Sequence, residues 1–136
     1  MNVFISYAAP DRDLAHFVAK ALNARNFTVL HPDETFPPGQ NWGTHLAHAL
    51  EGANAMVVFL SEQAAASENV RNEVSFALGS KQYAERVIPI LIGNPRSVPW
   101  ILRDMNHFRF EGDRQHLVDA ITKALSSPIE QAGAAQ

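Results

Sequence analysis

The residue of this 136-residue chain that is best suited to chemistry is Glu73. It lies between Val70 and Val74, two apolar residues at helical spacing, so its carboxylate is expected on the inner side of a helix. Most helix glutamates are solvated or paired with a cation, and we expect Glu62 and Glu68 to be exposed in that way. A carboxylate held away from water can instead stabilise a positive charge that develops during a reaction. Glu73 is therefore the candidate catalytic residue.

Further candidates lie beside a short apolar run at the start of the chain and beside the helix of Glu73. Ser6, Tyr7 and Ala8 come at the end of that run, and we expect them to contact a ligand partly through backbone groups. The alternative for these three residues is ordinary packing at the end of a strand. Ser67 precedes the helix of Glu73, where a serine hydroxyl can accept a hydrogen bond from a backbone N–H and cap the helix.

A Pro-rich loop over His31–Gln40 introduces two more candidates. Its three prolines and one glycine exclude it from a helix or a central strand. Asp33 lies in this loop, where an exposed surface position is the alternative to a binding role. Trp42 follows the loop, either as an anchor in the core or as a contact to a ligand. His45 and His48 have a spacing that can hold a metal, but no third ligand is near them, so we expect no metal site.

Composition restricts the class of protein. A hydrophobic fraction of 46% and a charged fraction of 18% are typical of one globular domain. The net charge is -3 and the Lys and Arg residues form no cluster, so neither a nucleic acid nor an anionic membrane is expected as a partner. The chain has no cysteine, which excludes a disulfide framework, a thiolate metal site and a cysteine nucleophile.

The chain begins without a signal-peptide pattern, and no apolar run approaches the roughly 20 residues that span a bilayer. We therefore expect a cytoplasmic protein. The expected domain covers residues 1–126, and residues 127–136 are expected to form a flexible tail or the start of a linker, because they are small, polar and rich in Ala and Gly.

Short apolar runs and helical spacings alternate along the chain and predict the elements that position the candidate residues. Strands are predicted over residues 3–6, 27–30, 55–60, 87–92 and 107–110. Pro89 is awkward in the fourth strand, which should therefore start late or lie near an edge. Helices are predicted from Pro10 to about Asn23, Trp42 to Leu50, Ser67 to Leu78 and Asp113 to Leu125. The third helix should turn Val70, Val74, Ala77 and Leu78 inward.

This alternation predicts an α/β fold with a parallel sheet and helices on both faces, a flavodoxin-like three-layer arrangement with strand order 2-1-3-4-5. Ligands bind such sheets at the carboxyl ends of the strands where the order reverses, which here lies between strands one and three. The residues there do not fit three common relatives. Ser6-Tyr7-Ala8 and Leu60-Ser61 lack the acids of a phosphoacceptor receiver, Ala8-Ala9-Pro10 is not a flavin-phosphate turn, and the chain has no G-x-G-x-x-G.

Five segments, in order, resemble the TIR (Toll/interleukin-1 receptor) domain family over Val3 to about Leu125. They are Phe4-Ile5-Ser6-Tyr7 followed by Asp11, Pro38-Gly39-Gln40-Asn41-Trp42, Val57-Val58-Phe59-Leu60-Ser61, Ser67-x-x-Val70-x-x-Glu73, and Val87-Ile88-Pro89-Ile90. The fourth looks like the segment that carries the catalytic glutamate of bacterial NAD-cleaving members. One departure is Asn69, which stands where many members have a tryptophan.

The resemblance implies an NAD+ nucleosidase that releases nicotinamide together with ADP-ribose or a cyclic ADP-ribose isomer. NAD+ is then the substrate, and no cofactor is expected. Glu73 would be catalytic. The residues implied to bind the substrate are Ser6, Tyr7, Ala8, Asp33, Trp42, Ser67 and Asn69.

The behaviour of the family implies self-association through TIR–TIR contacts that involve the loop over residues 31–40, and a role in bacterial anti-phage defence or signalling. A sensor domain would have to follow Gln136. Two alternatives stay open. One is a non-catalytic adaptor that only assembles with other TIR domains, and the other is an enzyme like the nucleoside deoxyribosyltransferases.

Overall fold

The computed structural model describes residues 1–30, 50–80, 83, 86–93 and 107–126. Its centre is a sheet of five parallel strands in the order β2-β1-β3-β4-β5, which confirms the predicted fold class and strand order. The strands are β1 (Asn2–Ser6), β2 (Thr28–Leu30), β3 (Ala55–Leu60), β4 (Val87–Ile92) and β5 (Phe108–Phe110).

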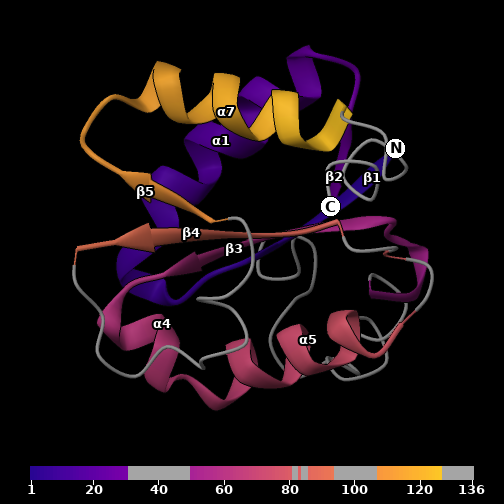
Figure 1. The fold of residues 1–136 in the computed structure, drawn as a ribbon, viewed down its shortest axis with the longest axis vertical. Helices are drawn as coiled ribbons and strands as arrows, with labels where there is room; N and C mark the ends of the chain where they lie inside the picture. Colours follow the sequence, from indigo (N-terminus) through magenta and orange to yellow (C-terminus); the bar gives the residue numbers. More distant parts are fainter. Residues whose placement is uncertain (31–49, 81–82, 84–85, 94–106, 127–136) are drawn as a thin grey trace, which may run out of the picture.

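Helices cover both faces of this sheet (Figure 1). The helix α1 (Arg12–Ala24), preceded by a short 3-10 turn η1 (Ala9–Asp11), lies with α7 (Arg114–Ser126) on one face. The other face carries α4 (Glu62–Ala66) and α5 (Glu68–Leu78). Of the predicted second helix only its end is described, where residues 50–52 are helical and Leu50 is buried.

The alternation of side chains along the strands divides the core into two layers. Val57 and Phe59 of β3 pack with residues of α1 and α7, whereas Met56, Val58 and Leu60 pack with residues of α4 and α5. All six residues of β3 are buried, as the continuous apolar run predicted for a strand that is covered on both faces. Whether a residue of β3 has an odd or an even number therefore determines which of the two helix layers its side chain packs against.

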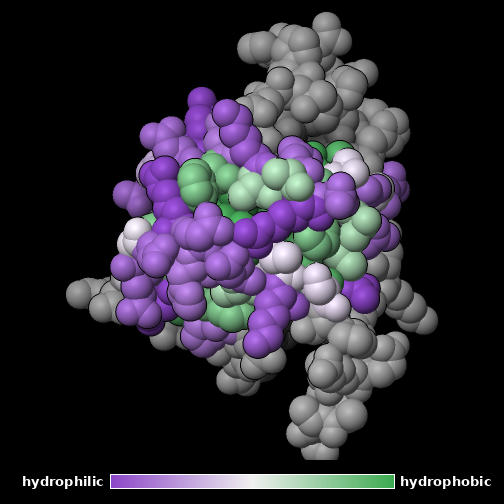
Figure 2. Space-filling model, turned by 90° about the horizontal axis from the view of Figure 1, so that it is seen from above, coloured by the Kyte–Doolittle hydropathy of each residue, from purple (hydrophilic) through white to green (hydrophobic). Residues whose placement is uncertain are grey.

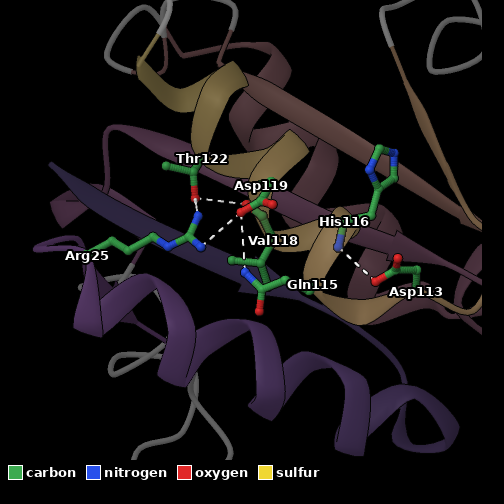
Figure 3. Close-up of polar contacts among 7 residues, drawn as sticks. All are labelled: Arg25, Asp113, Gln115, His116, Val118, Asp119 and Thr122. Atoms are coloured by element: carbon green, nitrogen blue, oxygen red, sulfur yellow. Dashed lines mark hydrogen bonds and ion pairs between the residues drawn. The ribbon is translucent and has the colours of Figure 1, made fainter.

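Polar contacts join the C-terminal end of α1 to the middle part of α7 (Figure 3). Arg25, which follows α1, pairs with Asp119 of α7 at 2.9 Å and donates a second hydrogen bond of 2.9 Å to the hydroxyl of Thr122. The guanidinium of Arg114 lies 5.3 Å from the centre of the Phe17 ring. Seen from the side of these helices, the described surface is mainly hydrophilic, with hydrophobic side chains in small separate patches (Figure 2).

The structure tests two predictions about individual positions. Of the two alternatives for the strand of Pro89, a position near an edge is confirmed, and the position predicted for Leu78 is wrong. The fourth strand does not start late, because Pro89 lies inside β4, which begins at Val87. Proline is accommodated there because β5 pairs with β4 only from Ile90 onward, so the ladder on that side does not require an N–H from Pro89. The position of β4 next to the edge strand β5 agrees with the other half of the prediction.

Leu78 was predicted on the inner face of the third helix and is instead 39% exposed. Glu73 and Val74 are both buried, and at 100° per residue Leu78 lies about 90° from the middle of the face that they define. Val70 and Ala77 are buried as predicted. The face of α5 that packs on the sheet is therefore centred between Glu73 and Val74, in line with the buried Val70 and Ala77.

Candidate functional site

The candidate catalytic residue, Glu73, is buried against the end of the first strand. Its side chain is 6% exposed, and the hydroxyl of Ser6 donates a hydrogen bond of 2.7 Å to its Oε1. Ser6 is the last residue of β1 and has the same odd-or-even position as Phe4, which packs in the layer of α5. The prediction that Glu73 lies on the inner side of its helix is confirmed in this geometry.

The start of α5 sets the position of Glu73 along the helix. Ser67 is the N-cap, and its hydroxyl accepts a hydrogen bond of 3.3 Å from the backbone N–H of Val70, as the sequence predicted. Val70 and Val74 then pack into the core on either side of Glu73. The neighbouring Glu62 and Glu68 are exposed, as expected.

Burial changes the acidity of this carboxyl. It raises the pKa of Glu73 to about 7, because the charged form loses its hydration, and the hydrogen bond from Ser6 acts in the opposite direction. Tyr83 is fully buried and donates a hydrogen bond of 2.7 Å to the backbone carbonyl of Leu50. Burial, and then the negative charge of Glu73, raise the pKa of Tyr83 to about 12, so this tyrosine is neutral at physiological pH.

A second carboxylate–hydroxyl pair lies at the same edge of the sheet. The hydroxyl of Ser61, which directly follows β3, donates a hydrogen bond of 2.6 Å to Oδ2 of Asp11. Both residues are buried, and burial raises the pKa of Asp11 while the bond from Ser61 lowers it. Ser61 also caps the short helix α4 by accepting a hydrogen bond from the N–H of Ala64. Sequence reasoning missed this pair, although Asp11 was noted as part of the first motif.

Local signals were present for each member of the second pair but not for their contact. Asp11 follows Pro10 at the start of a helix, where an aspartate normally caps its own helix, yet here its side chain makes no capping bond. Ser61 begins a stretch of helix-forming residues that became α4, an element the sequence analysis did not predict. A contact between residues 50 positions apart depends on the pairing of the strands that carry them.

Both pairs lie at the point where the strand order reverses. Strand β1 pairs with β2 on one side and with β3 on the other, and Ser6 is aligned with Val58 near the end of β3. Ligands bind parallel sheets outside the carboxyl ends of the strands at such a point. The structure therefore brings together Ser6, Glu73, Asp11 and Ser61 at the edge where the sequence predicted a site.

Other predicted binding residues have packing roles in the structure. Tyr7 is half-buried against the core, with its ring in edge-to-face contact with His16 at 6.2 Å. Ala8 is half-buried and packs against the layer of α4 and α5. Asp33, Trp42, His45 and His48 and the side chain of Asn69 lie outside the described residues. The binding roles of Tyr7, Ala8, Asp33, Trp42 and Asn69 stay predictions, and so does the expectation that His45 and His48 hold no metal.

No described helix combines the length and the apolar character needed to cross a membrane.

Comparison with solved structures gives several similar folds. A metazoan TIR-STING receptor from C. gigas, solved in complex with 2',3'-cGAMP, has a TM-score of 0.76 and 23% identity over 93% of this chain and 39% of its own. The TIR domains of the activated Roq1 resistosome, which recognises the effector XopQ, have a TM-score of 0.73 and 16% identity over 91% of this chain and 98% of theirs. The CMP N-glycosidase BcmB of Clostridium botulinum has a TM-score of 0.64 and 13% identity over 90% and 98% of the two chains.

At these levels of identity the likeness shows the fold alone. The chain spans about two fifths of the length of the TIR-STING receptor that it matches. A search of curated proteins finds no match. The family model described as the TIR domain, however, matches residues 3–125, which is nearly the whole of the sheet and its helices. The chain therefore belongs to the TIR domain family.

Proposed function

We propose that this TIR domain is an NAD+ nucleosidase that uses Glu73 to cleave the bond between nicotinamide and ribose. The observation that carries the proposal is the buried carboxylate of Glu73 at the reversal point of the sheet, held by the hydroxyl of Ser6 at 2.7 Å. Taking a carboxylate out of water costs free energy, and a glutamate on the surface avoids that cost. The burial of Glu73 is therefore better explained by function than by stability. A carboxyl whose pKa is perturbed by burial at a ligand-binding edge is a marker of a functional site.

One carboxylate is chemically sufficient for this reaction. The nicotinamide ring of NAD+ is a cationic pyridinium, and when the C–N bond breaks, the bonding electrons return to the ring nitrogen and neutral nicotinamide leaves. No general acid is needed to protonate it, unlike the leaving group of an O-glycoside, which one of the two carboxylates of a glycosidase protonates. The ribose becomes an oxocarbenium-like cation, and an ionised Glu73 would stabilise it electrostatically. Water then adds to the cation and loses a proton, which gives ADP-ribose, or an internal nucleophile gives a cyclic isomer.

The proposal includes a requirement for self-association. TIR domains of the Roq1 resistosome are seen within an assembly. We propose that this chain associates through TIR–TIR contacts that involve residues 31–40, and that it acts in the cytoplasm as an effector or signal producer of bacterial anti-phage defence. A trigger would come from a sensor domain or from a separate partner protein.

The test is NAD+ turnover by the purified chain at high concentration, with products separated by chromatography. The substitution Glu73→Gln keeps the shape of the side chain and removes the charge, so we expect turnover to fall by about 10²–10³-fold. The matched control is Glu68→Gln, because Glu68 is exposed on the same helix and should be dispensable. If the wild-type chain consumes no NAD+ even when it is tethered into oligomers, NAD+ cleavage is excluded, and the non-catalytic adaptor and the nucleotide reaction described next remain.

A second candidate reaction is hydrolysis of the N-glycosidic bond of a nucleoside monophosphate, and two observations favour it. The fold is similar to that of a CMP N-glycosidase, and a carboxyl with a pKa of about 7 holds a proton in a large share of the molecules at neutral pH. A neutral pyrimidine base leaves more easily when it is protonated, so Glu73 would then serve as a general acid. Incubation of the wild-type chain and Glu73→Gln with CMP distinguishes this candidate from NAD+ cleavage.

A further inference from the structure

We propose that Ser6 is the positioning residue of Glu73, and that its hydroxyl holds Oε1 so that Oε2 is left to meet the ribose of the substrate. This inference rests on the proposed function, since it names the group that orients the catalytic carboxylate. It also gives Ser6 a role different from the contact with the substrate that the sequence suggested.

The donor capacity of serine supports this role. A hydroxyl has one hydrogen to donate, and that of Ser6 goes to Glu73 over 2.7 Å. While this bond is present, the hydroxyl cannot donate to a phosphate or a ribose of the ligand. Among the described residues Ser6 is the hydrogen-bond partner of Glu73, and the bond is made to Oε1. The second oxygen of the carboxylate is therefore the one that can turn to a bound substrate.

Both ends of this hydrogen bond are fixed by regular structure. Ser6 is 1% exposed and is the last residue of β1, aligned with Val58 of β3. Glu73 lies on α5 between Val70 and Val74, which pack into the core. A catalytic group is held most accurately when its supporting residue lies on a rigid element and its own rotamer is fixed by packing. The contact joins a strand to a helix and does not depend on a loop.

The hydrogen bond also keeps the carboxyl ionisable. Burial raises the pKa of Glu73, and the bond from Ser6 lowers it, because a donor favours the charged form. Without the hydroxyl, the carboxyl would take up a proton at a higher pH and would lose the charge that the reaction needs. Among the described residues, Tyr83 is the other group whose pKa Glu73 affects, and with a pKa of about 12 it is neutral in the range where Glu73 titrates.

The experiment is a titration of the Glu73 side-chain carboxyl by 13C NMR, with the resonance assigned from its loss in Glu73→Gln. Ser6→Ala removes the donor, and we expect the titration midpoint to rise by about one pH unit. Ser6→Thr keeps a hydroxyl at this position and should return the midpoint towards the wild-type value. If Ser6→Ala does not fold, Ser6→Cys supplies a weaker donor and should give a smaller rise in the midpoint.

The chain provides a matched control in Ser61→Ala. This substitution removes a hydroxyl that donates to the other buried carboxylate, Asp11, over 2.6 Å at the same edge of the sheet. It should leave the midpoint of Glu73 unchanged. If Ser6→Ala does not move the midpoint, or if Ser61→Ala moves it equally, the positioning role is excluded, because the first result shows no coupling and the second shows only a general loosening of the edge.

The kinetic counterpart of the titration is the pH profile of NAD+ cleavage. In Ser6→Ala the acidic limb of kcat/KM should move to higher pH by the same amount as the NMR midpoint, and kcat should fall more than KM rises. A smaller folded fraction alone would lower kcat and leave KM unchanged, but it would not move the acidic limb, so the shift of the limb is the result that identifies the positioning role. The titration uses no substrate, so an inactive wild-type chain would overturn the proposed function and would leave the NMR result to decide on Ser6.

Discussion

The hydroxyl of Ser6 donates a hydrogen bond to Oε1 of Glu73 across 67 positions of the chain. The partner of this buried carboxylate is thus a neutral serine. Among the described residues no cation pairs with it. Such a partner offsets only part of the cost of removing the charge from water, and the pKa of Glu73 remains raised to about 7. The titration of Glu73 should consequently contribute to the pH dependence of both the stability and the proposed activity of this domain.

The first prediction concerns stability. Between pH 4.5 and about 7 the unfolded chain releases the proton of Glu73 while the folded chain retains it, so the free energy of unfolding falls as pH rises through this window. Glu73→Gln removes the effect and should be more stable than the wild type by up to about 3 kcal/mol near pH 8, with little difference near pH 4. Urea denaturation at several pH values measures this difference.

Glu68→Gln is the control for that series, because Glu68 is exposed at the first turn of the same helix. Its stability difference from the wild type should be small and should not grow from acid to alkaline pH. A Glu73→Gln variant that was less stable than the wild type near pH 8 would contradict the raised pKa.

The second prediction is the direction of the pH profile. NAD+ cleavage needs ionised Glu73, so kcat/KM of the wild-type chain should increase with pH and level off above a midpoint of about 7. A nucleotide N-glycosidase that uses Glu73 as a general acid would lose activity over the same range. Initial rates with NAD+ and with CMP, measured from about pH 5.5 to about pH 9, separate the two reactions. A rate of NAD+ cleavage that stayed flat from about pH 5.5 upward would contradict the raised pKa of Glu73.

The third prediction concerns the second carboxylate–hydroxyl pair. Ser61→Ala removes both the cap of α4 and the partner of buried Asp11, and should cost about 2 kcal/mol of unfolding free energy at neutral pH. Ser67→Ala removes a cap of similar geometry on α5 and should cost about 1 kcal/mol. The difference in unfolding free energy between Ser61→Ala and Ser67→Ala should become smaller at acidic pH, because Asp11 then takes up a proton and carries no charge.

Urea denaturation of both serine variants at neutral and acidic pH measures this difference. Equal losses at neutral pH would indicate that the bond between Ser61 and Asp11 adds nothing to the capping of α4.

The fourth prediction concerns Tyr83. Tyr83→Phe keeps the buried ring, which makes an edge-to-face contact with Phe76, and removes the hydroxyl that donates to the carbonyl of Leu50. We expect a loss of about 1 kcal/mol in urea denaturation and no change in the titration midpoint of Glu73, because Tyr83 is neutral throughout that titration. A changed midpoint would show that the hydroxyl acts on Glu73 and not on Leu50 alone.

Much of the fold was predictable because its signals are local. The continuous apolar run over Ala55–Leu60 predicted a strand buried on both faces, and the spacing of Val70 and Val74 predicted that Glu73 faces inward. The strand order followed from the regular alternation of strands and helices, which few topologies accommodate. Leu78 shows where such reasoning ends, since its spacing from Val74 fits an inner position while the real helix is turned to bury Glu73 and leave Leu78 exposed.

The sequence by itself thus determined the family, the sheet and the candidate catalytic glutamate. Only the tertiary structure decided which groups surround that glutamate, because Ser6 and Glu73, or Asp11 and Ser61, meet through the alignment of β1 with β3 and the placement of helices on the two faces. The raised pKa of Glu73 has the same origin, since desolvation depends on everything packed around a group and not on its neighbours in the chain. The spacing of residues predicts the direction in which a side chain points. The groups that surround that side chain come from several strands and helices, so only the tertiary structure shows them.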